Sequence, residues 1–312
     1  MSKSTNVWIG MWLLAGMAFG LETNTPSDPG QESAPESAQV DAESGEWITF
    51  YYPGGGKARE GHLYRGRRHG MWKGWYFDGT LAYEGAYLNY QYEGPWVFYS
   101  KDGSKLDQGS FSAGLRQGKW TRFFPTGKKM SQSNWKDGKQ EGLRQHFSPE
   151  GKLSAEYTFV DGVRVGPSRL FGAKGNLLMS GNYVRNGKQG EWTYFAPSGD
   201  RKSLGQFDRD VEAGLWQFFF PTGEVEAQGD YINGSQEGAW FGFHPDGKTR
   251  FEGQFKGGKP TGLWVHYRIN GLRQSSGQME DGSRTGWWQE WDEFGRPDDG
   301  ASGFYEQGRK KE

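Results

Sequence analysis

The chain has 312 residues, among them 51 Gly, 21 Phe, 15 Trp and 15 Tyr, and its apolar content of 34% is too low and too aromatic for a core of Leu, Ile and Val. This composition favours short strands joined by tight turns. Cysteine is absent, which excludes disulfides and thiolate sites. The net charge is −1, and the chain outside its acidic residues 21–44 is only mildly cationic, which argues against nucleic acid as a partner.

Residues 1–20 have the pattern of a secretory signal peptide. Lys3 gives a positive start, Val7–Gly20 is an apolar run, and Ala18-Phe19-Gly20 fits a small-x-small cleavage site. Met17 stands where a lipoprotein would carry its lipidated cysteine, which argues against a lipid anchor. We therefore expect the mature protein to be secreted, periplasmic or held in the cell envelope. An uncleaved N-terminal membrane anchor is the alternative.

Residues 21–44 are predicted to be a disordered linker. The stretch is rich in Pro and Ser and contains no Lys or Arg. Its acids are Glu22, Asp28, Glu32, Glu36, Asp41 and Glu43. It has too little apolar surface to form a core of its own.

Residues 45–308 form an internal repeat of about eleven units, followed by a charged tail at 309–312. After a first step of 25 residues, a glycine recurs every 24 residues, and we number each unit from this glycine as position 0. These glycines are Gly45, Gly70, Gly94, Gly118, Gly142, Gly166, Gly190, Gly214, Gly238, Gly262 and Gly286. A fixed period of this length is typical of stacked repeat architectures.

A second glycine follows at position 9, often after Asp or Asn. The position-9 residues include Gly79, Gly103, Gly127, Gly151, Gly175, Gly199, Gly223, Gly247, Gly271 and Gly295. Asp-Gly and Asn-Gly between apolar runs predict a hairpin, because glycine accepts positive φ there.

Aromatic residues keep the same period. Position 5 is aromatic in all eleven units, from Phe50 in the first to Trp291 in the last. Position 2 is Trp at Trp47, Trp72, Trp96, Trp120, Trp192, Trp216, Trp240, Trp264 and Trp288. A third glycine at position 15 occurs as Gly85, Gly109, Gly181, Gly205, Gly229, Gly253 and Gly277.

If the position-9 glycine marks the hairpin tip, position 2 faces position 15 on the returning strand. The Trp would then cover a bare glycine. One unit supports this register, because Arg144 replaces the Trp where Tyr157 replaces the glycine. Positions 2 and 5 differ in parity, so a regular strand would place their side chains on opposite faces, whereas a bulge could bring them together. The spacing leaves both arrangements open.

Segments such as Tyr83–Tyr87 followed by Glu93–Tyr99 resemble MORN repeats. The 24-residue period is most similar to the bacterial MORN variant of the YwqK-like, antitoxin-type group. The resemblance implies an all-β fold, namely an elongated single-layer antiparallel sheet of about eleven stacked β-hairpins that serves as a scaffold or binding surface. It does not supply a partner.

Motifs that suggest chemistry are better explained by the repeat. Gly242–Thr249 fits the P-loop pattern, but Gly247 is the position-9 glycine of its unit and no helix is expected after it. Asp208–Glu212 has alternating acids, yet Ala213 and Phe219 stand where a calcium loop needs Gly and Glu, so a solvated turn is expected. The five histidines fall in different units without metal-ligand spacing. We therefore expect no enzymatic activity, no metal and no cofactor.

The pattern lapses in the middle of the array, where Arg144 and Ser168 replace Trp, and Ser133 and Tyr157 replace the third glycine. Candidate binding residues in this region are Arg144, His146, Tyr157, Arg164 and Arg169. Degeneration of the middle units is the alternative explanation.

The aromatic rows also have two interpretations: they pack the sheet, or they form a groove for a ligand. We expect an extracytoplasmic scaffold that binds a protein partner through its β surface. Contact with carbohydrate or lipid headgroups through the Trp and Tyr rows is the alternative.

Overall fold

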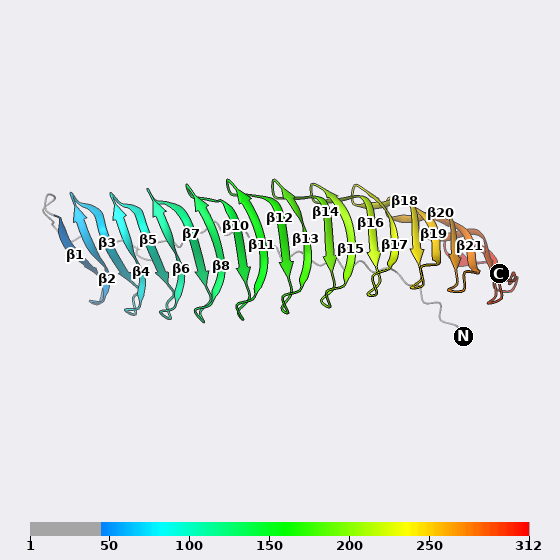
Figure 1. The fold of residues 1–312 in the computed structure, drawn as a ribbon, viewed down its shortest axis with the longest axis horizontal. Coiled ribbons are helices and arrows are strands. Elements are labelled where there is room, and N and C mark those ends of the chain that lie inside the picture. The colour runs from blue at the N-terminus through cyan, green and yellow to red at the C-terminus, as the bar shows by residue number, and fades with distance from the viewer. Residues whose placement is uncertain (1–44, 312) are drawn as a thin grey trace. The chain divides into compact units, whose positions relative to one another are not determined.

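The computed structural model describes residues 45–311, which form 24 β-strands (Figure 1). The predicted signal peptide (1–20), the linker (21–44) and Glu312 lie outside the described residues. None of residues 45–311 forms a helix that could cross a membrane. The strands are β1 (Glu46–Tyr51), β2 (Lys57–Tyr64), β3 (Arg67–Trp75), β4 (Leu81–Leu88), β5 (Gln91–Tyr99), β6 (Lys105–Ser112), β7 (Leu115–Phe123), β8 (Lys129–Lys136), β9 (Lys139–Gln140), β10 (Gly142–Phe147), β11 (Leu153–Val160), β12 (Val163–Phe171), β13 (Leu177–Val184), β14 (Gly187–Phe195), β15 (Arg201–Asp208), β16 (Val211–Phe219), β17 (Val225–Ile232), β18 (Ser235–Phe243), β19 (Thr249–Lys256), β20 (Lys259–Tyr267), β21 (Arg273–Glu280), β22 (Ser283–Glu290), β23 (Gly303–Glu306) and β24 (Arg309–Lys310).

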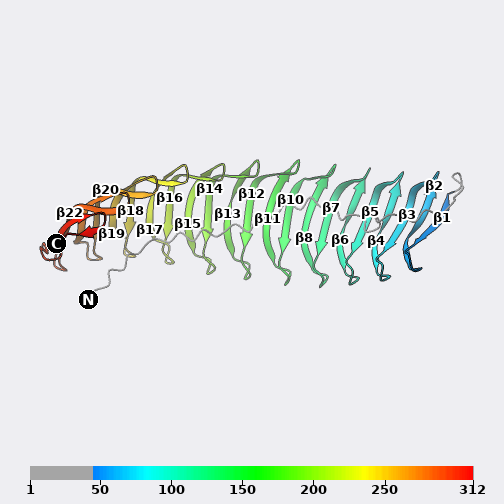
Figure 2. The same ribbon diagram turned by 180° about the vertical axis from the view of Figure 1, so that it is seen from behind.

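All these strands belong to one antiparallel sheet. Each strand pairs with its neighbour in the chain, as β2 does with β3 and β3 with β4, and β8 pairs with both the short β9 and β10. Figures 1 and 2 show the strands side by side in the order of their colours. The predicted all-β, single-layer array of stacked hairpins, elongated across its strands, is confirmed. Arg309 and Lys310, expected in the charged tail, form β24 and pair with β23.

The loops at position 9 are wider than the tight Asp-Gly turn that the sequence suggests. In the loop between β3 and β4 the Tyr76 N–H donates to the Thr80 carbonyl at 2.8 Å, and the Gly79 N–H donates to the Tyr76 carbonyl at 2.9 Å. Gly79 has a φ of 86°, which glycine adopts without strain. The expectation that this glycine marks a hairpin is confirmed, but the hairpin has a five-residue connection.

Two-residue turns lie at the other end of the strands. Arg65 and Gly66, between β2 and β3, have φ values of 50° and 70°, the positive pair of a type I′ turn. Several such turns carry no glycine, as at Arg209 and Asp210, with φ values of 49° and 68°. The solvated turn expected at Asp208–Glu212 is therefore present. Each turn after the first is tied to the preceding hairpin, since the Gly114 N–H, for example, donates to the carbonyl 22 residues earlier at 2.9 Å.

The position-0 glycine forms a β-bulge. Between β2 and β3 the pairs Gly61–Trp72 and His62–His69 leave Gly70 and Met71 without a partner on β2. From Gly70 to Gly286 the position-0 glycines have φ between 61° and 73°, a conformation that disfavours residues with a Cβ. A recurring glycine at this position is therefore explained by the bulge.

The aromatic residues at positions 2 and 5 lie on opposite faces. Tyr99 donates a hydrogen bond to Glu84 Oε1 at 2.8 Å. Glu84 precedes Gly85, which pairs with Trp72 on one side and Trp96 on the other. Because successive residues point to opposite faces, Tyr99 lies away from the tryptophans. We call the side bearing Trp72, Trp96 and Trp120 the tryptophan face.

The first unit begins one residue later than the glycine pattern indicates. Ile48 pairs with Gly61 and therefore occupies position 2, whereas Trp47 pairs with His62 and is 52% exposed. Phe50 accordingly stands at position 4 and stacks on Trp72, with 6.3 Å between the ring centroids. The assignment of Trp47 and Phe50 to positions 2 and 5 is wrong, because Gly45 lies outside β1 and the 24-residue period runs unbroken from Glu46.

Candidate functional site

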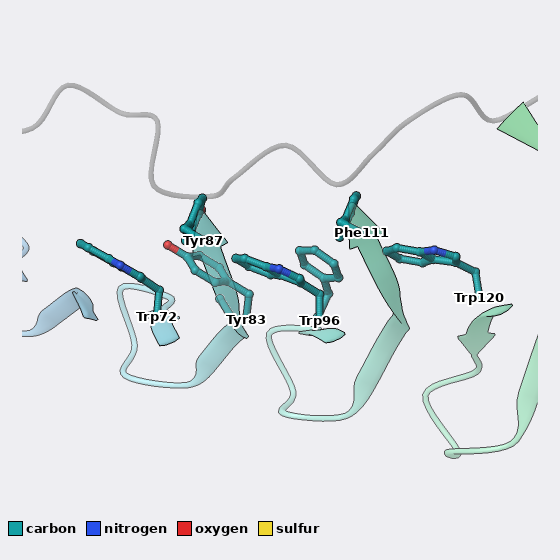
Figure 3. Close-up of a cluster of buried hydrophobic side chains, with 8 residues drawn as sticks. Trp72, Tyr83, Tyr87, Trp96, Phe111 and Trp120 are labelled. Atoms are coloured by element: carbon teal, nitrogen blue, oxygen red, sulfur yellow. The ribbon is translucent and has the colours of Figure 1, made fainter. Parts of the chain in front are cut away.

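The tryptophans of position 2 form the core of a sheet that has one layer. They are between 0 and 7% exposed. Figure 3 shows Trp72, Trp96 and Trp120 in a row, with Tyr87 and Phe111 between them. The buried members of the row are Trp72, Trp96, Trp120, Trp192, Trp216, Trp240, Trp264 and Trp288. The interpretation of these rings as packing is the one the geometry favours.

Each indole covers the glycine at position 15 of the preceding unit. A Cβ on Gly61 would lie 2.4 Å from Trp72 Cδ2, and a Cβ on Gly229 would lie 2.3 Å from Trp240 Cδ2. Each indole N–H also donates to the carbonyl ten residues earlier, as Trp96 does to Ala86 at 2.9 Å. The ring therefore satisfies its polar atom while its face covers bare backbone, and it is not presented to solvent.

The register predicted from the sequence is confirmed, because Trp72 pairs with Gly85 and Arg144 pairs with Tyr157. The large residue at position 15 is, however, matched by a small residue at position 2 of the next unit and not of its own unit. Tyr157 also pairs with Ser168, the next residue at position 2, and Ser168 leaves room for the tyrosine ring. Every buried tryptophan in the row follows a glycine at position 15 of the unit before it.

Four of the five candidate residues from the pattern lapse lie on the tryptophan face. The Arg164 guanidinium lies 4.5 Å from the Tyr157 ring centroid and 4.6 Å from that of Tyr183. His146 meets Tyr157 edge to face with 6.0 Å between centroids, and Arg144 pairs with Tyr157 across the strands. Tyr157 thus takes the place under the cation that an indole has in regular units.

Arg169 does not join this group. It pairs with Glu156 across the strands, and its guanidinium lies 3.7 Å from the Glu156 carboxylate. Glu156 precedes Tyr157, so both residues of this ion pair lie on the face away from the tryptophans.

Cations at position 22 cover the rings of the tryptophan face. Arg68 lies 5.1 Å from the centroids of both Trp72 and Tyr87. Lys188 lies 4.9 Å from Trp192 and 4.7 Å from Phe207. Comparable contacts of Arg116, Arg164 and Arg284 repeat this arrangement. Sequence reasoning missed this row of cations, because position 22 also holds Tyr92, Gln140 and Glu212. That position 22 lies beside the rings follows only from the geometry of the tight turn and the bulge.

Burial and the positive charge of this face together shift the pKa of a histidine within it. Burial, together with Arg144 and Arg164, lowers the pKa of His146 to about 4. The imidazole is therefore neutral at neutral pH. On β6, further along the same face, desolvation raises the pKa of the buried Asp107 carboxyl although Arg116 lies 3.2 Å away.

The opposite face carries a second row, made of exposed apolar side chains. They stand at position 1 of some units and at position 18 of others, next to the buried residues of positions 2 and 17, so they point away from the tryptophans. They are 44 to 56% exposed. We call them the outer apolar row: Tyr64, Met71, Leu88, Leu143, Val160, Val184, Leu215, Ile232, Leu263 and Trp287.

The position-9 glycines hold the geometry of the wide loops. Their φ values range from 77° to 102°. Those predicted as structural are Gly79, Gly103, Gly127, Gly199, Gly223 and Gly247. The P-loop-like segment Gly242–Thr249 joins β18 to β19, and its loop is closed by the His244 N–H donating to the Lys248 carbonyl at 2.8 Å. A strand therefore follows the segment where a phosphate-binding loop needs a helix.

A shallow depression of about 250 Å³ lies beside the tight turns in the middle of the array. It is lined by Lys136, Asp137, Lys139, Glu141 and Asp161. Lys139 and Asp161 form an ion pair at 3.7 Å, and both are well exposed. The depression has the character of a solvated set of turns.

Comparison with known proteins gives a family match and distant alignments with solved structures. No curated protein sequence matches the chain significantly. The crystal structure of TcdB2-TccC3 aligns with 78% of this chain and 14% of its own at 11% identity and a TM-score of 0.19, and that of TcdB2-TccC3-Cdc42 aligns with 78% and 14% at 13% identity and 0.18. These scores are too low to support any inference.

The family described as MORN repeat variant matches residues 68–89, 116–137, 140–161, 213–233 and 236–256. The matched segments begin close to multiples of 24 residues apart, in phase with the hairpins. The chain therefore carries MORN repeats of the variant type in at least five of its hairpins.

Proposed function

We propose that this chain is a non-enzymatic scaffold that binds another protein through its extended β surface. The observation that carries the proposal is the outer apolar row, which exposes aliphatic and aromatic side chains at position 1 or position 18 in seven of the eleven units. Exposed apolar side chains scattered singly are normal, but a row in register along a sheet is typical of an interaction surface.

The alternative of carbohydrate or lipid-headgroup binding through the Trp and Tyr rows has less support. Stacking on a sugar or lying in a lipid headgroup layer requires exposed ring faces. The tryptophans of position 2 are at most 7% exposed, and their N–H groups are bound to backbone carbonyls such as that of His62. This alternative therefore depends on exposed rings outside the buried tryptophans, such as Trp47, Phe77 and Trp287.

We further propose that the protein acts outside the cytoplasm, as the signal-like residues 1–20 suggest. Assignment to the YwqK-like, antitoxin-type group also stays a proposal, which an adjacent toxin gene would support. The distribution of the chain between cytoplasmic and envelope fractions, together with N-terminal sequencing of the mature form, tests the location.

The binding proposal is tested with the chain as bait in envelope extracts. The double variant Leu215→Asp, Ile232→Asp should lose the captured protein, because it places two carboxylates in the outer apolar row of one hairpin. Lys119→Asp is the matched control, since Lys119 stands at position 1 of another unit and is already polar. Saturable binding to glycans or liposomes with no protein captured would overturn the proposal, as would equal capture by both variants.

A further inference from the structure

Charge is distributed unevenly along the tryptophan face. In β1–β14 the strand register places seven cations on this face, against one acid, Asp107. The cations are Arg59, Arg68, Arg116, Arg122, Arg144, Arg164 and Lys188. In β15–β22 the corresponding positions carry Glu212, Glu290 and Arg284. The overall charge of the chain is −1, so the net charge gives no sign that half of this face is positive.

Aromatic rings and hydrogen bonds hold these cations and their strands in place. Arg164 lies over two tyrosine rings, and its backbone N–H donates to Asn186 Oδ1 at 2.8 Å. Lys188 lies over Trp192 and donates to the Tyr194 hydroxyl at 2.9 Å. Desolvation lowers the pKa of Lys188. A fixed, half-buried cation gains more from an added anion than a mobile surface lysine does.

We propose that the tryptophan face of β2–β14 binds an extended acidic segment of a protein partner, whose carboxylates pair with the cations along the face. This surface is distinct from the outer apolar row, so the inference goes beyond the proposed function. At ~4.8 Å between strands the cationic part extends roughly 50 Å, which about 16 residues of extended chain would cover. Seven cations over that distance suit a segment with an acid at every second or third residue.

A protein segment fits this face better than a nucleic acid. Binding of single strands depends on bases stacking on exposed aromatic rings. Here the rings of Trp72 and Trp192 are 0% exposed, and cations cover their faces. The face therefore offers charge and guanidinium donors, but no stacking platform.

The test uses the full chain and a labelled 18-residue peptide with Glu at every third position and Ser and Gly elsewhere. Its counterpart has Gln in place of Glu. We expect saturable binding of the Glu peptide that weakens as salt is raised, and at least ten-fold weaker binding of the Gln peptide. Equal affinity for the two peptides would overturn the proposal, as would tighter binding of a single-stranded oligonucleotide of equal charge.

Variants of the two faces locate the site. Arg164→Gln and Lys188→Gln should each weaken the Glu peptide about five-fold, since each removes one half-buried cation. Arg169→Gln is the matched control on the opposite face and should leave binding unchanged. Arg164→Lys keeps the charge and should restore most of the affinity, which separates loss of charge from damage to the sheet. Equal weakening by Arg164→Gln and Arg169→Gln would refute the location.

The two proposals fail independently. Loss of peptide binding with intact protein capture by the outer apolar row would remove only this inference. The converse result would remove only the proposed function.

Discussion

The close approach of tryptophan to glycine predicts a large effect from a very small substitution, Gly229→Ala. The added Cβ would lie 2.3 Å from Trp240 Cδ2, whereas carbon atoms in contact are ordinarily ~3.5 to 4 Å apart. The indole must therefore move by more than about 1 Å. The movement strains the 3.2 Å hydrogen bond from its N–H to the Asp230 carbonyl. Overpacking of this kind costs ~1 to 3 kcal/mol and a lost hydrogen bond about 1 kcal/mol, so we expect the local free energy of unfolding of this hairpin to fall by about 2 to 4 kcal/mol.

Hydrogen exchange is the appropriate assay, because repeat arrays unfold by units and a single global free energy is poorly defined for them. Amides of β17 and β18 should lose protection in Gly229→Ala while those of β3 and β4 keep it. Gly56→Ala is the control, since its Cβ would meet nothing closer than a carbonyl oxygen at 3.9 Å. In the double variant with Trp240→Leu the two effects should be less than additive by over ~1 kcal/mol. Equal loss of protection in Gly229→Ala and Gly56→Ala would refute the reasoning.

Three further predictions concern other parts of the repeat. Ala113→Gly, at a turn residue with a φ of 48°, should raise the free energy of unfolding by about 0.5 to 1 kcal/mol in thermal unfolding, whereas Ala239→Gly, exposed within β18, should lower it by a similar amount. Ser168→Trp alone should destabilise β11 and β12, because Tyr157 fills that space, and adding Tyr157→Gly should restore stability. No rescue in hydrogen exchange would contradict the pairing of each buried tryptophan with a glycine at position 15 of the preceding unit. Burial lowers the pKa of His146 and of His266 to about 4, below the ordinary 6.5, so both are neutral in the folded state and their protonation favours unfolding. Stability should therefore be full above pH 6.5 and fall as the pH drops from 6.5 towards 4, and the double variant to Gln should show a shallower fall in urea unfolding.

Much of the fold could be predicted because the same residue types recur at the same structural positions in many units. Glycine at position 15 and tryptophan at position 2 recur together, and hairpin geometry then gives the observed pair of Trp72 with Gly85. The sequence could not show that the covered glycine belongs to the preceding unit, since Trp72 has glycines in register on both sides. Only the tilt of the indole distinguishes Gly61 from Gly85.

The turns and the surfaces were harder to predict. Tight turns such as Arg209-Asp210 carry no glycine, so the strongest turn signal pointed to the wider loop at position 9. The glycine at position 0 recurs as clearly as a turn glycine, although it forms a bulge within a strand. The outer apolar row and the cations of position 22 vary from unit to unit, as Leu215 and Lys119 do at position 1. Which of them share a face follows from the bulge, and the spacing alone left that open.

The central claim is that the array binds a protein along several units at once, through the outer apolar row. It is tested most directly by hydrogen exchange of the chain with and without the captured protein. The account predicts added protection around positions 1 and 18 in at least three of the hairpins that carry the outer apolar row, and no such protection with the Leu215→Asp, Ile232→Asp variant. Protection confined to one loop, or unchanged in that variant, would contradict it.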